Sequence, residues 1–278
     1  MDSLKISVPG VQGPLPVSTL LAWGAALVAL YLVSPWLTRL LNRLLARMPR
    51  GAVGETLTIW ALCFTGILVT YPFSGTLAKI VATCGFLYLP LLSMDRRGED
   101  FPDYGITLRA WKKDLAYTLG VLAVVTPLFL GGYWAFAQAL TMMPERVAQF
   151  ISPYGTTYHF ELRLPARFGE WVIDQFLVVA LPEEFFYRGF IQTRLTDAWP
   201  DGRRVFGVRV GRAFFLTALL FALGHLAIFQ FWRLGVFFPA LIFGWVRERT
   251  GTVIGAAIVH AVFNLMMLVM EASFYGRG

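Results

Sequence analysis

The stretch Leu-Pro-Glu-Glu-Phe-Phe-Tyr-Arg-Gly-Phe at residues 181–190 places two adjacent carboxylates and an arginine inside a strongly apolar, aromatic segment. Insertion scales assign a cost of about 2.5–3.5 kcal/mol to each such residue at the centre of a membrane-spanning helix. If this segment crosses a membrane, Glu183, Glu184 and Arg188 need a reason to be there, and they predict a functional polar centre.

The composition of the chain indicates that this segment does cross a membrane. Of the 278 residues, 57% are hydrophobic and 15% are charged, and the mean hydropathy is +0.61. A soluble domain of this length carries about 25% charged residues. Apolar runs of spanning length recur from end to end, so we expect residues 1–278 to form a single integral membrane domain with no separate soluble domain.

The net charge of +7 does not indicate a nucleic-acid partner. The basic residues fall in short loops between apolar runs, as the positive-inside rule expects. No zinc-finger, RNP or helix-turn-helix pattern and no glycine-rich phosphate loop is present. Cys63 and Cys84 each lie in an apolar run, where a free cysteine behaves as a small hydrophobe, so we expect no disulfide framework.

Eight apolar stretches are expected to form membrane-spanning helices. They cover residues 17–37, 57–71, 77–92, 115–137, 171–191, 214–229, 235–246 and 252–270. Before them, residues 1–16 form a short head; residues 17–137 hold the first four helices, and residues 171–270 hold the four that carry the chemistry. With both termini outside, every arginine-rich loop falls on the cytoplasmic side. The expected fold is therefore an all-α, polytopic bundle of about eight helices in the lipid bilayer, which would be the inner or plasma membrane in a prokaryote.

Helical spacing decides which polar side chains can meet within residues 181–190. Glu184 and Arg188 are four residues apart, so they share a helix face and can pair. Glu183 lies about 100° further round the helix and can face a different neighbour. Pro182 removes one backbone hydrogen bond, which predicts a local kink.

Two later helices carry the remaining candidates for the polar centre. His225 lies in the stretch 214–229, while His260 and Asn264 share one face of the stretch 252–270. At about 1.5 Å per residue, Glu183, His260 and Asn264 fall at similar depths in a core of ~30 Å, and His225 falls nearer the outer side. These side chains are therefore expected to converge.

Such a group has the chemistry of hydrolysis. Glu183 and His225 can hold and deprotonate a water molecule, and His260 and Asn264 can donate hydrogen bonds to the oxyanion of a carbonyl under attack. We expect no cofactor. A divalent metal such as zinc, held by Glu183, His225 and His260, is the alternative use of these residues, although the pattern HExxH is absent.

Three short motifs, in order and on separate predicted helices, support this interpretation. They are EExxxR at residues 183–188, FxxxH at residues 221–225 and HxxxN at residues 260–264. Together they resemble the CAAX-protease and bacteriocin-processing (CPBP) family, also called the Rce1-like or ABI family. The resemblance covers about the last 100 residues; the first four predicted helices carry no motif.

The resemblance implies an intramembrane endopeptidase of glutamic type, a family once classed as metalloproteases. It implies that Glu183 is the base, that His225 helps to position the water, and that His260 and Asn264 form the oxyanion hole. Glu184 and Arg188 then give structural support. The implied substrate is a membrane-anchored protein or peptide, such as a C-terminal tail, cut near a helix end or in an unwound stretch because helical backbone is already hydrogen-bonded.

Two other classes of function remain open at this point. A non-proteolytic immunity or scaffold protein of the same fold would tolerate loss of Glu183, His225, His260 and Asn264. A proton-coupled transporter would be expected to show internal repeats, and none is evident in the sequence.

Overall fold

The computed structural model describes residues 34–43, 46, 51–152, 158–228 and 230–276. The predicted head at residues 1–16 and most of the predicted helix at residues 17–37 lie outside this part of the chain. Residues 34–43, where the described part begins, are helical.

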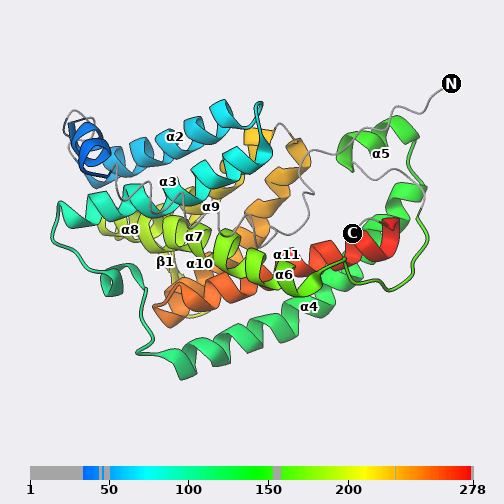
Figure 1. Cartoon of the computed structure of the whole chain (residues 1–278). Coiled ribbons are helices and arrows are strands. Elements are labelled where there is room, and N and C mark those ends of the chain that lie inside the picture. Colours follow the sequence, from blue (N-terminus) through cyan, green and yellow to red (C-terminus); the bar gives the residue numbers. More distant parts are fainter. Residues whose placement is uncertain (1–33, 44–45, 47–50, 153–157, 229, 277–278) are drawn as a thin grey trace.

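The described chain is an all-α bundle with one small hairpin, as the sequence predicts for fold class (Figure 1). Four of its helices are long and apolar enough to cross a membrane, as expected of an integral membrane protein. They are α2 (Ala52–Thr70), α3 (Gly75–Asp95), α4 (Trp111–Thr141) and α11 (Ile254–Tyr275). The segment between α4 and the next long helical stretch, predicted to lie outside, contains the short helix α5 (Glu145–Ile151).

The predicted helix at residues 171–191 is one continuous helical stretch over residues 168–198, and it changes winding along its length. Its segments are α6 (Phe168–Ile173), the π-helix η2 (Asp174–Ala180), α7 (Leu181–Glu184), the π-helix η3 (Phe185–Gln192) and α8 (Thr193–Ala198). We refer to residues 168–198 as the motif helix. The two wide segments flank the glutamate pair, and such π turns often occur at functional sites.

Pro182 explains part of this departure from α geometry. Proline has no backbone N–H, so residue 182 cannot pair with the carbonyl of Val178 as an α-helix requires. That carbonyl accepts a hydrogen bond of 3.2 Å from Thr83 Oγ1 on α3. A neighbouring helix thus satisfies a backbone group next to the glutamates.

The remaining elements follow the predicted order with two differences. The predicted helix at residues 214–229 ends earlier as an α-helix, because its last turn has 3₁₀ winding. The hairpin was not predicted; its turn, Phe206-Gly207, has positive φ at both residues, of 48° and 80°. The elements are η1 (Phe101–Tyr104), β1 (Arg203–Val205), β2 (Val208–Val210), α9 (Arg212–Gly224), η4 (His225–Ile228), η5 (Phe231–Val236) and α10 (Phe237–Thr250).

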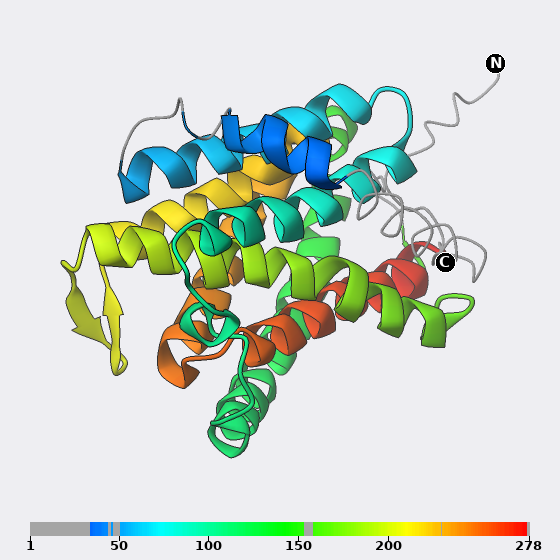
Figure 2. The same ribbon diagram turned by 60° about the vertical axis from the view of Figure 1, so that its left-hand side comes forward.

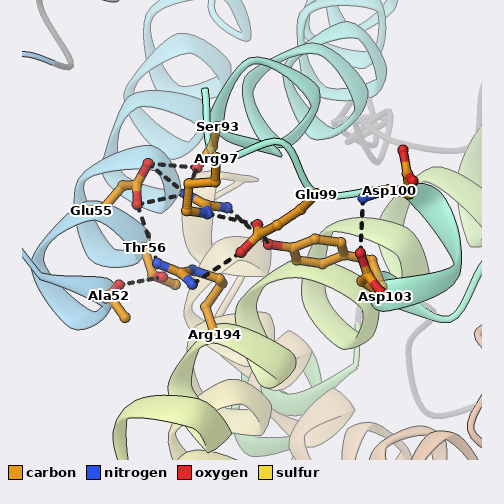
Figure 3. A network of polar contacts seen from close by, with 10 residues as sticks. Ala52, Glu55, Thr56, Ser93, Arg97, Glu99, Asp100, Asp103 and Arg194 are labelled. Atoms are coloured by element: carbon orange, nitrogen blue, oxygen red, sulfur yellow. Dashed lines mark hydrogen bonds and ion pairs between the residues drawn. The ribbon is translucent and has the colours of Figure 1, made fainter. Parts of the chain in front are cut away.

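Within the described chain, the loops that follow α3, α8 and α10 gather at one end of the bundle, which we call the arginine-rich end. Figure 3 shows a network of polar contacts at this end. Arg97, just after α3, donates hydrogen bonds to Glu55 of α2 at 2.9 Å and to Glu99 at 2.6 Å. Arg194 of α8 lies 3.6 Å from Glu55, and Tyr104 donates to Glu99. The network joins the start of α2, the end of α3 and the end of the motif helix.

A second contact at this end ties α4 to α11. The carboxylate of Asp114, in the first turn of α4, accepts hydrogen bonds from the Thr252 hydroxyl and, at 3.2 Å, from the Gly255 N–H. Backbone N–H groups at a helix start have no partner within the helix, so an acceptor from another helix stabilises the start of α11. This contact holds the helix that carries His260 and Asn264.

The apolar core surrounds the motif helix. Several of its deeply buried aromatic side chains come from that helix, from α9 and from α10: Phe185, Phe186, Phe190, Phe221 and Phe243. Arg188 lies among them and is the largest of the fully buried side chains. The polar residues of the opening stretch are therefore at the centre of the bundle.

Candidate active site

Glu184 and Arg188 form a fully buried ion pair on one face of the motif helix, as their spacing predicts. Arg188 Nη1 lies 2.9 Å from Glu184 Oε1, and both side chains are 0% exposed. Arg188 Nη2 donates to the carbonyl of Ala240 on α10 at 3.0 Å. The guanidinium lies over the rings of Phe221 and Phe243, 4.4 Å and 5.1 Å from their centroids, where cation–π attraction offsets part of its desolvation.

His260 connects this ion pair to Glu183. Its Nδ1 lies 2.8 Å from Glu184 Oε1, and its Nε2 lies 3.9 Å from Glu183 Oε2. A carboxylate can only accept a hydrogen bond, so Nδ1 carries the proton in this contact. The imidazole also stacks on Phe243, with centroids 4.7 Å apart. The ring is thus fixed between two carboxylates of the same motif.

The two glutamates differ in their access to solvent. The Glu184 side chain is 0% exposed, whereas that of Glu183 is 20% exposed. Glu183 Oε2 is itself a buried atom with no hydrogen-bond partner among the described residues. Of the two carboxylates, Glu183 is therefore the one that a water molecule or a substrate can reach.

Asn264 belongs to a polar chain that runs to α3. Its Nδ2 donates to Gln175 Oε1 at 2.9 Å, and Gln175 Nε2 donates to Asp174 Oδ2 at 3.1 Å. Both oxygens of Asp174 accept from Lys79 Nζ at 2.8 Å. We call Lys79, Asp174, Gln175 and Asn264 the amide chain. Each residue fixes the orientation of the next, because a side-chain amide must present its oxygen to a donor and its nitrogen to an acceptor.

Lys79, Asp174 and Gln175 were not predicted as site residues. The signal that could have found them is the one that found Glu183, since each lies within a predicted spanning stretch, 77–92 or 171–191. What the sequence does not show is that the three residues form one chain ending at Asn264.

His225 lies at the end of α9 and is separated from His260. Its Nδ1 lies 2.9 Å from the carbonyl oxygen of Phe221, so this nitrogen is the donor and Nε2 is left as an acceptor. The Phe221 ring lies between the two imidazoles, with its centroid 4.7 Å from that of His225 and 5.6 Å from that of His260. Within the described chain, no hydrogen bond joins His225 to Glu183 or to His260.

The structure thus brings the predicted residues together to different degrees. Glu183, Glu184, Arg188 and His260 form one connected group, which we call the glutamate–histidine group. Asn264 is on the same helix as His260 and is held by the amide chain, and His225 lies across Phe221.

The residues named as an alternative metal set do not form one in the described part of the chain. No three His, Cys, Asp or Glu side chains there are placed to hold a metal ion together. Glu183, His225 and His260 as arranged do not fit such a ligand set.

Comparison with known proteins agrees with the three motifs. Residues 168–266, a little over a third of the chain, match the family described as type II CAAX prenyl endopeptidase Rce1-like. No curated protein and no solved structure matches the chain.

The fold and this match agree on the segment that carries the three motifs. The buried glutamate–histidine group lies within the residues similar to the Rce1-like CAAX endopeptidases, in a bundle with four helices long and apolar enough to cross a membrane. Residues 168–266 form an Rce1-like domain, and the resemblance drawn from the motifs is confirmed.

Proposed function

We propose that this chain is an intramembrane endopeptidase that cleaves a membrane-anchored peptide or C-terminal tail, with Glu183 as the general base. The observation that carries the proposal is the position of Glu183, which is partly accessible, has an unpartnered carboxylate oxygen and lies 3.9 Å from His260 Nε2. A base in a hydrolase must be within reach of both a water molecule and a group that supports the transition state.

The reaction begins with proton transfer from water to the Glu183 carboxylate. The water oxygen forms a bond to the scissile carbonyl carbon, and the electrons of the carbonyl π bond move to its oxygen, which gives a tetrahedral oxyanion. The oxyanion then re-forms the carbonyl, the C–N bond breaks, and the proton held by Glu183 passes to the leaving nitrogen. The products are a carboxylic acid and an amine, and the carboxylate of Glu183 is restored.

His260 supports the oxyanion in its protonated form. With Nδ1–H directed at Glu184, a neutral His260 has only a lone pair at Nε2 and cannot donate there. The imidazolium donates at both nitrogens, and the buried carboxylate of Glu184 stabilises its charge, in the way that an aspartate supports a histidine in a catalytic triad. The buried glutamate is thus a positioning residue that acts through His260.

Asn264 provides a second donor. One N–H of its amide is taken by Gln175, and the other is available to the oxyanion. The amide chain holds that amide in one orientation, and such support is what a hydrogen-bond donor to a transition state requires.

His225 has a different part in the proposal. The Phe221 carbonyl holds its Nδ1–H, so its Nε2 can accept a hydrogen bond from the attacking water. His225 thereby assists Glu183 in orienting the water.

The experiment that tests the proposal is cleavage in membranes that co-express the chain with candidate C-terminally anchored substrates. The native chain is compared with Glu183→Gln, and Glu145→Gln on the exposed helix α5 serves as a control of the same chemistry. Equal expression is checked for all three. Loss of product only with Glu183→Gln supports the proposal, and unchanged cleavage with that variant overturns it.

Two further outcomes of the same experiment address the alternatives. If purified active protein loses activity with a chelator and regains it with zinc, a metal takes part. If the native chain binds an anchored peptide that it leaves intact, and Glu183→Gln binds it equally well, the chain is a scaffold of the same fold.

A further inference from the structure

The hairpin β1–β2 is a feature of the fold that the proposed catalysis does not use. In Figure 2 it lies at the end of the bundle where α8 ends and α9 begins, and it extends across the direction of those helices. One face packs on the protein through Val208, which is 3% exposed. The hairpin therefore has an opposite face that is free of the bundle.

That opposite face carries two like charges in direct opposition. Arg204 pairs with Arg209 in the antiparallel register, and both are exposed. Arg203 is exposed too, although the alternation of side chains along a strand places it on the face of Val208. Like charges directly across a pair of strands destabilise it. Arg203 and Arg204 have no ion pair or hydrogen bond within the part of the chain that the structure describes. The arrangement is unfavourable for the isolated hairpin and favourable for a hairpin that binds anions.

The turn residue Phe206 is likewise a poor choice for the turn itself. Turns with positive φ at both central residues favour Asn-Gly, and a bulky residue in this region is an outlier. Phe206 has a φ of 48°, and it is 86% exposed. Neither the turn nor the core requires this phenylalanine, and its exposed apolar ring is available for contact outside the protein.

Contacts with helix α10 set the depth of the turn. Trp245 of α10 donates from Nε1 to the Phe206 carbonyl at 3.3 Å, and Arg249 donates to the Gly207 carbonyl at 3.4 Å. Trp245 also meets the ring of Tyr117 on α4, with centroids 5.9 Å apart. Tryptophan and tyrosine near the ends of membrane helices lie at the level of the lipid headgroups. The turn is thus held at that level.

We propose that residues 203–210 form a lipid-binding hairpin, whose arginines bind the anionic headgroups of the leaflet at the arginine-rich end while Phe206 enters the boundary of the acyl chains. A membrane surface provides both a negative charge for the arginines and an apolar layer for the ring, whereas a soluble anion provides only the first. The inference does not depend on the proposed catalysis.

The test measures lipid binding by the purified full-length chain. The protein in neutral detergent is titrated with phosphatidylglycerol and, separately, with phosphatidylcholine, and the dissociation constant of the first bound lipid is read by native mass spectrometry. Arg203→Gln/Arg204→Gln is expected to weaken phosphatidylglycerol binding at least fivefold and to leave phosphatidylcholine binding unchanged. Lys112→Gln/Lys113→Gln removes the same charge from exposed residues at the same end and is the matched control.

Phe206→Asn separates membrane contact from folding. Asparagine suits the positive φ of this position, so the variant should unfold at the same or a higher temperature than the native chain. It should nevertheless weaken phosphatidylglycerol binding by about twofold or more, because the proposed contact between the Phe206 ring and the acyl chains is lost.

Three results would overturn the inference. Arg203→Gln/Arg204→Gln could bind phosphatidylglycerol as the native chain does. The lysine control could lose as much affinity as the arginine variant, which would show a general effect of charge at this end. Millimolar inorganic phosphate could displace phosphatidylglycerol from the native chain, which would show a site for soluble anions.

Discussion

His260 Nδ1 lies 2.8 Å from Glu184 Oε1 while His260 Nε2 lies 3.9 Å from Glu183 Oε2, so one imidazole joins the two adjacent glutamates. This relationship gives the tandem carboxylates separate tasks. The two side chains leave the helix about 100° apart, so one can turn to the buried arginine while the other faces the accessible side. In our proposal the first glutamate reacts and the second holds the histidine.

Glu184→Gln should therefore remove activity and stability together. The amide keeps the shape of the side chain but leaves Arg188 as an uncompensated buried charge, which typically costs about 3–5 kcal/mol of unfolding free energy. It also removes the charge that supports a protonated His260, and we expect the cleavage rate to fall at least 100-fold. Denaturant unfolding in detergent and cleavage of an anchored peptide measure the two effects.

The double variant Glu184→Gln/Arg188→Met separates the effect on activity from the effect on stability. With the arginine removed as well, no unpaired charge remains, so most of the stability should return. Activity should stay low, because His260 still lacks its carboxylate. A double variant that regains native cleavage would contradict the role proposed for Glu184.

The amide chain predicts coupling between two helices. Gln175→Leu takes away the acceptor of the Asn264 amide, and we expect about a tenfold to 100-fold lower cleavage rate, less than the roughly 100-fold to 1,000-fold loss seen when an oxyanion donor itself is removed. Because the glutamine acts through Asn264, the double variant Gln175→Leu/Asn264→Ala should be no slower than Asn264→Ala alone. Additive losses in this double-mutant cycle would mean that the two residues act independently.

The backbone next to the glutamates predicts a second coupling, this time in stability. Thr83→Val removes the hydrogen bond to the Val178 carbonyl and should lower the unfolding free energy by about 1 kcal/mol. In a Pro182→Ala background the restored N–H can serve that carbonyl, so Thr83→Val should cost less there. Thermal unfolding of the native chain, the two single variants and the double variant measures this difference. An equal loss of stability from Thr83→Val in both backgrounds would refute this explanation.

The network at the arginine-rich end predicts a pH dependence of stability. Burial and, after it, the hydrogen bond to Glu99 together raise the pKa of Tyr104 to about 12. The folded state therefore keeps a proton that the unfolded chain loses near its ordinary pKa of 10, so stability should fall as pH rises from 10 towards 12. Partial burial raises the pKa of Glu99, but hydrogen bonds from Tyr104 and Arg97 outweigh it and place this pKa below the ordinary 4.5.

Glu99 therefore stabilises the fold fully above pH 4.5, and this contribution is lost as pH falls through its folded pKa. Tyr104→Phe is the variant that tests the alkaline limb. The unfolding temperatures of the native chain and of this variant should converge between pH 10 and pH 12, because the native chain alone loses the phenol contribution. Parallel curves over that interval would show that the phenol does not titrate as described.

Local spacing was sufficient for one part of the site and insufficient for the rest. The pairing of Glu184 with Arg188 could be predicted, because residues four apart on a helix are neighbours whatever surrounds them. The positions of most helices followed from the lengths of the apolar runs. The contact of His260 with both glutamates depends on how α11 packs on the motif helix, and periodicity carries no information on that.

Other features were missed for identifiable reasons. Part of the π winding is explained by the missing N–H of Pro182 and by Thr83, a partner on another helix, and a pattern of apolar residues looks the same for α and π winding. The hairpin at residues 203–210 has no favourable turn sequence, since phenylalanine stands where asparagine is expected. His225 was expected inside a helix, and the 3₁₀ turn that begins there places it across Phe221 from His260.

The most direct test of the central claim is the single-turnover rate of peptide cleavage by purified chain reconstituted in bilayers, compared between the native chain and Glu183→Gln at equal protein. If Glu183 is the base, the variant should bind the anchored peptide with native affinity and cleave it at least about 100-fold more slowly, as expected for loss of a general base. Cleavage by Glu183→Gln at the native rate would contradict the account.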